Sequence, residues 1–270
     1  MLLTRMNLLL LGVFLSISTV SAAEQNFPGR NKFPNIPVYE ITELKDAMDR
    51  VVIVDSRSQY EFETLRIKGA KNIPVASDTF EADLAKLRAS TDKPIVFYCN
   101  GRTCFKSYIA TKKANDAGIK NTFAFDAGIF EWANAYPQQA VLLNQSPVKV
   151  SDLISSAVYK ARLLHPDQFS EKATAHNHKS MVLDVRDKYQ RAGVGFFPGK
   201  ERWVSLDQKD RIIRYIQKAK QQNKTLYVYD EVGKQVRWLQ YELEKAGLKN
   251  YYFMDKGASG YYDSIAKSDG

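Results

Sequence analysis

The chain has 270 residues, 44% of them hydrophobic and 26% charged, a balance that is ordinary for a globular protein and a length that suits two domains. Its net charge of +9 comes from basic residues spread along the chain without a nucleic-acid-binding motif, so we expect no nucleic acid among its partners. The two cysteines, Cys99 and Cys104, lie close together, which excludes a fold held by many disulfides and indicates a chemical rather than a structural pair.

Residues 1–22 are predicted to be a cleavable signal peptide. Arg5 precedes an apolar stretch over residues 8–20 that is too short and too rich in serine for a comfortable membrane span, and Ala22 closes a small-x-small cleavage pattern. Met6 is an alternative start that keeps this stretch, and an uncleaved anchor is the alternative to cleavage. We therefore expect a periplasmic or secreted protein with no stable membrane span after cleavage.

The rest of the chain alternates between patterns typical of strands and of helices. Residues 23–37 are predicted to be an extended lead-in to a first domain at 38–137, which a linker at 138–150 joins to a second domain at 151–270. In the first domain we expect strands at 51–55, 95–99 and 122–125, helices at 41–48, 80–89 and 108–118, and a helix or turn at 58–65.

The second domain repeats the first. Residues 117–128 return as residues 246–257, and residues 54–57 return as residues 183–186, both at an offset of 129 residues. The alternation of strands and helices in each half predicts an α/β fold with two tandem domains, each a mainly parallel sheet flanked by helices. Between these segments, Leu226 to Asp230 matches the apolar run Ile95 to Cys99, so Asp230 stands where the first domain has Cys99, and the first loop-and-helix segment is two residues longer than the second.

Cys99 ends an apolar predicted strand, and a short polar loop leads from it into a helix. Loop N–H groups and the start of a helix favour an anion, and both lower the pKa of a thiol from about 8.5 toward neutrality. Arg102 and Lys106 add positive charge to this loop. The pattern therefore predicts that Cys99 is a reactive thiolate at the carboxyl end of the sheet, where α/β proteins place their ligands. The alternative is a buried, inert cysteine.

Several short motifs occur in the same order along the chain. Together they resemble the tandem rhodaneses, a family of sulfurtransferases, over essentially the whole mature chain. In the first domain they are Asp55-Ser56-Arg57 with Glu61, Gly69-Ala70 before Ile73-Pro74, Tyr98-Cys99, and Gly128 to Trp132. In the second they are Asp184 to Arg186, Phe197 to Gly199, and Gly257 with Tyr261.

The resemblance implies a persulfide mechanism, in which the Cys99 thiolate takes the outer sulfur of thiosulfate or a related anionic donor and passes it to cyanide, a thiol or a protein acceptor. It implies no metal and no organic cofactor. It also implies a catalytically silent second domain, because the Asp230 carboxylate cannot carry a sulfane sulfur. The loop would bind the donor through backbone groups and through the positive charges, with the substrate-binding residues Asn100, Gly101, Arg102, Thr103, Phe105 and Lys106.

Cys104 leaves several roles open. The usual family loop reaches its helix sooner, so counting back from the helix selects neither cysteine, and Cys104 is an alternative persulfide carrier. If Cys99 is the nucleophile, Cys104 is a resolving thiol that forms a disulfide, a structural disulfide partner, or a small apolar residue packed under the loop.

Three other functions are alternatives to sulfur transfer. The Cys99–Cys104 pair suits a thiol redox or sulfur-relay protein, and the loss of the cysteine in the second domain suits a non-enzymatic binding module. A phosphatase or arsenate reductase needs an arginine about six residues after the cysteine to hold a tetrahedral oxyanion, and Phe105 stands there instead.

Overall fold

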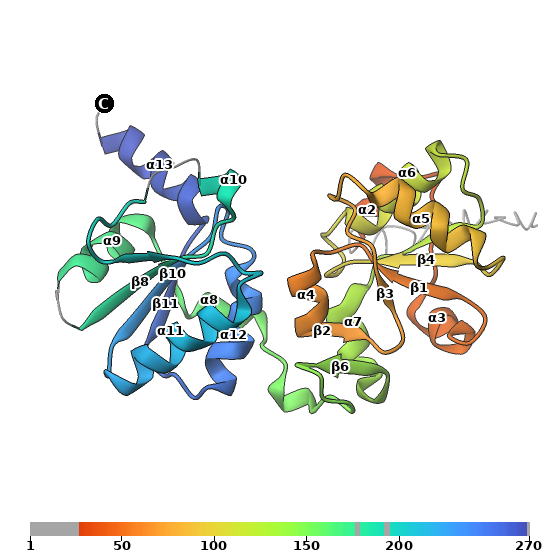
Figure 1. Ribbon diagram of the computed structural model, residues 1–270. Helices are drawn as coiled ribbons and strands as arrows, with labels where there is room; N and C mark the ends of the chain where they lie inside the picture. The colour runs from red at the N-terminus through yellow and green to blue at the C-terminus, as the bar shows by residue number, and fades with distance from the viewer. Residues whose placement is uncertain (1–26, 176–178, 192–194, 269–270) are drawn as a thin grey trace, which may run out of the picture.

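The computed structural model describes residues 27–175, 179–191 and 195–268, and these residues form two α/β units that follow one another along the chain (Figure 1). The predicted signal peptide lies outside the described residues. Within them, no helix combines the length and the hydropathy needed to cross a membrane.

The first unit is built on a four-stranded parallel sheet with the order β3-β1-β4-β5. Val38 extends it by a parallel bridge to Ala124 at the outer edge of β5. Its elements are α2 (Pro28–Lys32), α3 (Ile41–Ala47), β1 (Val52–Asp55), α4 (Gln59–Thr64), β2 (Leu65–Ile67), β3 (Lys71–Asn72), α5 (Phe80–Ala89), β4 (Ile95–Tyr98), α6 (Lys106–Asp116), β5 (Thr122–Phe125) and α7 (Gly128–Ala135).

Alternate residues of the central strands pack on opposite faces of this sheet, as the two-residue period of a strand requires. Val96 and Tyr98 of β4 join the side that carries α3 and α7, together with Trp132. Ile95 and Phe97 join the side that carries α5 and α6. The sheet is therefore buried on both faces, which is why its strands read as continuous apolar runs.

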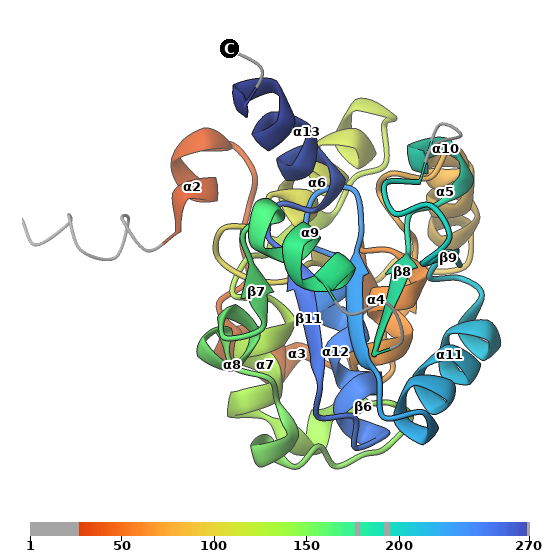
Figure 2. The same cartoon turned by 90° about the vertical axis from the view of Figure 1, so that its left-hand side faces the viewer.

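The second unit is built on a five-stranded parallel sheet with the order β7-β11-β10-β8-β9. Helices α9 and α11 flank its strands on two sides (Figure 2). Its elements are α8 (Ser156–Lys160), β7 (Leu163–Leu164), α9 (Pro166–Ala175), β8 (Ser180–Asp184), α10 (Lys188–Arg191), β9 (Glu201–Trp203), α11 (Lys209–Gln221), β10 (Thr225–Tyr229), α12 (Val236–Lys245), β11 (Tyr251–Met254) and α13 (Gly257–Ser268).

The two sheets have the same topology, because the Val38 bridge, β5, β4, β1 and β3 correspond in order to β7, β11, β10, β8 and β9. The prediction of an α/β fold with parallel sheets flanked by helices is confirmed. The cysteine loop lies between β4 and α6 and spans residues 99–105, whereas its counterpart between β10 and α12 spans residues 230–235. Of the two extra residues in the first copy, one lengthens the loop and the other lengthens the helix.

Two segments hold more structure than the sequence indicated. The lead-in at 23–37 contains α2, whose Arg30 side chain forms a bidentate pair with Asp126 at 2.9 and 3.2 Å. The segment at 138–150 contains η1 (Pro137–Gln139), β6 (Ala140–Leu142) and the start of η2 (Val150–Asp152). Strand β6 is buried and pairs antiparallel with β2, so part of the predicted linker packs within the first unit.

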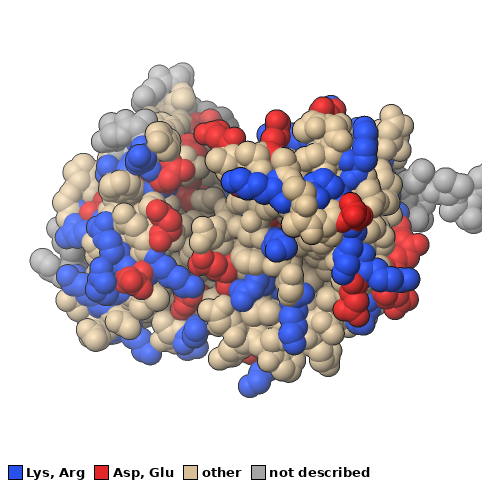
Figure 3. Space-filling model, turned by 45° about the vertical axis from the view of Figure 1, so that its right-hand side comes forward, with Lys and Arg blue, Asp and Glu red and all other residues tan. Residues whose placement is uncertain are grey.

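The two units are packed together through α12. Its residues Trp238 and Tyr241 belong to the same buried apolar cluster as Trp132 of the first unit. The Tyr241 hydroxyl accepts a hydrogen bond of 3.2 Å from the backbone N–H of Ile154, which anchors the connecting segment to the same helix. Figure 3 shows basic side chains on both units with acidic ones among them, so the positive charge on this face is spread rather than gathered.

Candidate functional site

The cysteine loop begins where β4 ends, at the carboxyl end of the sheet. Cys99 follows the last residue of β4, and a turn closed by the hydrogen bond from Cys104 N to Gly101 O, of 2.8 Å, reverses the chain. Helix α6 then begins at Lys106. Cys104 therefore lies two residues before the first turn of a helix of eleven residues, where unpaired N–H groups and the helix dipole favour an anion.

Cys99 is fully buried, with 0% of its surface exposed. Its Sγ lies 3.1 Å from the carbonyl oxygen of Cys104 and 3.8 Å from the hydroxyl of Ser107. Burial raises the pKa of the Cys99 thiol well above its ordinary value, and the hydrogen bond toward Cys104 raises it further. Cys99 is therefore a protonated donor rather than a thiolate at neutral pH.

Cys104 is partly exposed and has the opposite environment. The hydrogen bond from the Cys99 thiol and those from the N–H groups of Lys106 and Asn100 lower the pKa of Cys104 to about 6, although burial opposes them. The Lys106 ammonium lowers it further by its charge. Cys104 is thus the thiolate of the pair at neutral pH.

The expectation that the loop lowers the pKa of Cys99 is therefore wrong. The loop does favour a thiolate, but at Cys104, which the sequence offered as the alternative carrier. The physical reason is burial. Full burial of Cys99 outweighs the N–H and hydroxyl of Ser107, which favour its anion, whereas the Cys99 thiol and the N–H groups of Lys106 and Asn100 favour the anion of Cys104.

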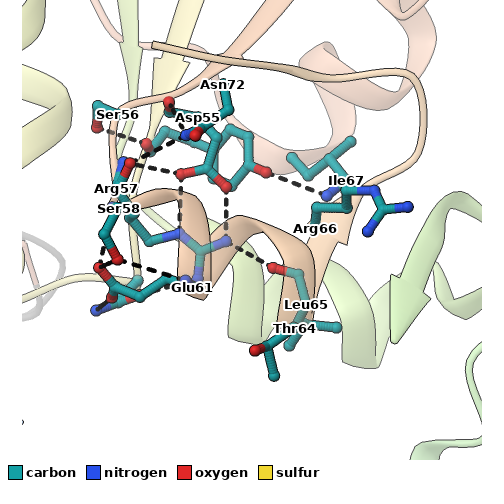
Figure 4. Close-up of polar contacts among 12 residues, drawn as sticks. Asp55, Ser56, Arg57, Ser58, Glu61, Thr64, Leu65, Arg66, Ile67 and Asn72 are labelled. Atoms are coloured by element: carbon teal, nitrogen blue, oxygen red, sulfur yellow. Dashed lines mark hydrogen bonds and ion pairs between the residues drawn. The ribbon is translucent and has the colours of Figure 1, made fainter. Parts of the chain in front are cut away.

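Asp55 and Arg57 form a buried ion pair behind the loop (Figure 4). Arg57 donates from Nη2 to Asp55 Oδ2 at 2.6 Å and to the carbonyl of Leu65 at 2.6 Å, and from Nε to Asp55 Oδ1 at 2.9 Å. The ion pair of Arg57 is thus with Asp55 rather than with Glu61. Both side chains are fully buried and tie the end of β1 to β2, so the role of the pair is structural.

Asn100 joins that pair to the loop. Its Oδ1 accepts a hydrogen bond of 3.1 Å from Arg57 Nη1, and its Nδ2 donates to Glu61 Oε1 at 3.2 Å. Glu61 also lies 3.5 Å from the Lys106 ammonium. Arg57 and Lys106 lower the pKa of Glu61 against the effect of burial. Glu61 is therefore a carboxylate that partly neutralises the positive charge of Lys106.

Arg102 is paired as well. Its guanidinium donates from Nε and Nη2 to the two carboxylate oxygens of Glu131 at 2.5 and 2.9 Å. The sequence predicted that Arg102 and Lys106 attract an anionic donor, but both are ion-paired here, and Glu131 was not anticipated because it lies 29 residues away. The net field at the loop is therefore weaker than two free cations would give.

The lead-in covers the outer side of the loop. The Phe33 ring lies 6.1 Å from that of Phe105, and the Phe27 ring lies 4.5 Å from the Arg102 guanidinium. Lys32 lies over the Phe105 ring at 4.9 Å. Phe105 is thus a packing residue for the lead-in, whereas the side chains of Arg102 and Lys106 are each 40% exposed.

The second unit repeats this geometry with a carboxylate. Ile129 N donates to Cys99 O in the first copy, and Ala258 N donates to Asp230 O in the second, at 2.9 and 2.8 Å. The Asp230 carboxylate accepts hydrogen bonds from four loop N–H groups, those of Val232, Gly233, Gln235 and Val236. Burial raises the pKa of Asp230, and these N–H groups lower it in turn. These four N–H groups, three in the loop and that of Val236 at the start of α12, are therefore already occupied by a side chain of the protein itself.

Among the residues that the structure describes, no three His, Cys, Asp or Glu side chains gather in a way that could hold a metal ion. The geometry of the cysteine loop, with Cys104 at the start of α6 and its pKa lowered to about 6, is suited to nucleophilic thiol chemistry.

Comparison with known proteins points the same way. Residues 40–135 match the family model described as "Rhodanese-like domain". The match supports a rhodanese-like domain in the first half of the chain, which is the coarser part of the resemblance seen in the sequence.

Individual relatives cover parts of the chain. The HTH-type transcriptional regulator Rv0324 of Mycobacterium tuberculosis is 38% identical over 82 residues, which are 30% of this chain and 34% of that protein, so the chain matches about a third of its length. The thiosulfate sulfurtransferase of Pseudomonas aeruginosa is 21% identical, covering 87% of this chain and 47% of that one, with a TM-score of 0.37. The single-domain sulfurtransferase RDL2 of Saccharomyces cerevisiae is 22% identical, covering 37% and 91%, with a TM-score of 0.32.

Proposed function

We propose that the first half of the chain is a sulfurtransferase that carries sulfane sulfur as a persulfide on Cys104. The observation that supports this most is the position of the Cys104 Sγ at the start of α6, where N–H groups and the Cys99 thiol lower its pKa to about 6. A thiolate at neutral pH is the nucleophile that sulfur transfer needs. The rhodanese-like match over residues 40–135 supports the same class of reaction.

The reaction has two steps. The Cys104 thiolate attacks the outer sulfur of thiosulfate, the bond between the two donor sulfurs breaks, and sulfite leaves with the electron pair. The N–H groups that held the thiolate then hold the terminal sulfur of the persulfide. An acceptor such as cyanide or a thiolate attacks that sulfur, takes it, and restores the Cys104 thiolate.

A second candidate is a thiol redox or sulfur-relay protein. It is favoured by the contact between the two cysteines, both free in this structure, with the thiol of Cys99 hydrogen-bonded to the side chain of Cys104. In that case the sulfur donor first converts Cys104 to a persulfide, and Cys99, on losing its proton, attacks the inner sulfur of that persulfide. Hydrosulfide leaves with the electron pair, and the two cysteines end as a disulfide.

The second half is proposed to be catalytically silent. Its loop N–H groups are occupied by Asp230, a side chain that cannot form a persulfide.

We also propose export of the protein, with removal of residues 1–22, on the strength of the sequence pattern of that segment alone. The mass of the N-terminal peptide of the protein recovered from a cell envelope fraction tests the cleavage.

Intact mass after brief exposure to thiosulfate tests the function. The wild type is expected to gain one sulfur, about 32 Da, as a covalent intermediate. Cys99→Ser is expected to keep that gain and Cys104→Ser to lose it. A gain that disappears only in Cys99→Ser would move the persulfide to Cys99, and a loss of two hydrogens without added sulfur would favour the redox candidate. If no donor changes the mass, and no thiocyanate forms when cyanide is added as the acceptor, the result would favour a non-enzymatic binding module.

A further inference from the structure

Four side chains form a continuous line of contacts across the boundary between the two units, and they come alternately from the first and the second. The Arg57 guanidinium lies 4.9 Å from the centre of the Trp238 ring, and that ring stacks on Phe130 at 5.2 Å with an interplanar angle of 11°. The Arg237 guanidinium lies 4.2 Å from the Phe130 ring. We call these four residues the interface stack.

The interface stack is desolvated at its centre. Trp238 is 1% exposed and Arg57 is 0% exposed. The Nε of Arg237 is buried and has no hydrogen-bond partner, and no ion pair within the described part of the chain engages this side chain. Burial lowers the pKa of Arg237. Its guanidinium lies over two aromatic rings, Phe130 at 4.2 Å and Tyr159 at 5.7 Å, and a cation over an aromatic face is worth more when it is desolvated.

Both first-unit members of the interface stack hold Asn100. Arg57 donates to the side-chain oxygen of Asn100 at 3.1 Å, and the backbone N–H of Phe130 donates to its carbonyl at 3.4 Å. Asn100 is in turn one of the two residues whose N–H groups donate to the Cys104 Sγ. A single residue thus separates the interface stack from the thiolate.

We propose that Trp238 is a positioning residue for the cysteine loop. By filling the space against Arg57 and Phe130, the indole fixes both groups that hold Asn100, and through Asn100 it fixes an N–H donor to the Cys104 sulfur. The second unit therefore contributes to the reactivity of the first without touching the sulfur. This inference rests on the proposed function in one respect only, that Cys104 is the reactive thiol.

The surroundings of Cys104 determine what a change in its pKa reports. The other groups that act on its sulfur are Cys99 and Lys106, with Glu61 on Lys106 at 3.5 Å. Trp238 and Phe130 touch the sulfur's surroundings through Asn100, which also donates to Glu61 at 3.2 Å. A change in the thiol pKa on altering Trp238 therefore reports on the position of Asn100, acting through its N–H and through Glu61 and Lys106.

The test is the pH dependence of alkylation of Cys104 by iodoacetamide, followed by mass spectrometry in a Cys99→Ala background and repeated with Cys99 present. Trp238→Leu and Phe130→Leu are each expected to raise the midpoint by about one pH unit, the effect of losing one hydrogen bond to the charged form. Trp238→Phe keeps a stacked ring and is expected to restore the midpoint. Trp203→Ala is the control, because the Trp203 indole N–H donates to the carbonyl of Arg186 at 2.8 Å and its ring lies 5.5 Å from the Arg191 guanidinium, both in the second unit.

An unchanged midpoint in both leucine variants would overturn the inference. Circular dichroism checks that each variant folds. If Trp238→Leu does not fold, the alkylation midpoint of Phe130→Leu decides the question, since Phe130 is only half-buried and tolerates the smaller side chain. Alkylation needs no sulfur donor, so the outcome is separate from that of the thiosulfate experiment. A protein that forms no persulfide and still shows the shift would retain the inference and lose the proposed function.

Discussion

The strongest quantitative prediction concerns the reactivity of Cys104 in acid. Its pKa is lowered to about 6 by the Cys99 thiol and two backbone N–H groups. At pH 5 a thiol with a pKa of about 6 is roughly 9% ionised, whereas an ordinary thiol with a pKa of about 8.5 is roughly 0.03% ionised, a ratio of about 300. The less basic thiolate is intrinsically slower by about 13-fold, taking a Brønsted slope of about 0.45. The net expectation is that Cys104 reacts about 20-fold faster than a peptide thiol at pH 5.

The same arithmetic predicts a much smaller advantage at neutral pH. At pH 7 the ionised fractions are roughly 90% and 3%, and the lower nucleophilicity leaves only about a two-fold difference. A comparison of labelling rates at neutral pH alone is therefore uninformative. The informative quantity is the rate of Cys104 relative to the reference thiol at pH 5, compared with the same relative rate at pH 7.

The assay is the rate of iodoacetamide labelling from pH 4.5 to 8.5, with glutathione as the reference thiol and Cys104→Ser as the control. Cys99 is buried and its pKa is raised, so the control is expected to label slowly at every pH in this range. A midpoint near pH 8.5 in the wild type, or fast labelling at pH 5 that survives in Cys104→Ser, would refute the assignment of the thiolate.

Three further outcomes can be measured. Gly118→Ala is expected to lower the free energy of unfolding, measured in urea, by about 1–2 kcal/mol, because Gly118 has a positive φ. Gly128→Ala is expected to lower it by more, because Gly128 also has a positive φ and a Cβ there would collide with the loop backbone. Equal losses in the two variants would contradict this. Asp230→Ala is expected to cost about 3 kcal/mol, since it leaves four loop N–H groups without their acceptor, and an unchanged urea midpoint would show that water replaces it. Glu131→Gln is expected to lower the KM for thiosulfate by releasing Arg102, with Arg102→Gln moving KM the other way; no change in either variant would place the donor elsewhere.

Much of the fold could be read from local patterns. The apolar run that predicted a strand at 95–99 is β4, and the repeat at an offset of 129 residues is matched by equivalent contacts, since Arg57 and Arg186 each pair with the aspartate two residues before them. These features are predictable because they depend on burial periodicity and on neighbours in the chain. The lead-in was not predictable in this way, because α2 is short and is held by contacts such as that of Arg30 with Asp126, 96 residues away.

The site was predictable to the level of the loop and no further. A strand, a cysteine and a helix in sequence indicate where a thiolate is favoured, but two cysteines in one loop require the directions of individual N–H groups to be known. The partners of Arg102 and Lys106 come from other helices, and Trp238 comes from the other half of the chain. No local signal marks such pairs, so the effective charge at the loop could be obtained only from the structure.

The cysteine loop and its counterpart in the second unit both place an acidic side chain at the start of a helix. In the second, the strand-end Asp230 turns its carboxylate onto the N–H of Val236, the first residue of α12. In the first, the N–H of Lys106, the first residue of α6, meets the sulfur of Cys104 instead. The helix start attracts an anion in both copies, and the copies differ in which side chain supplies it. A longer loop lets a thiol from the turn take that place while Cys99 remains beneath it as a donor, so the extra residue and the second cysteine act together to make the anion reactive.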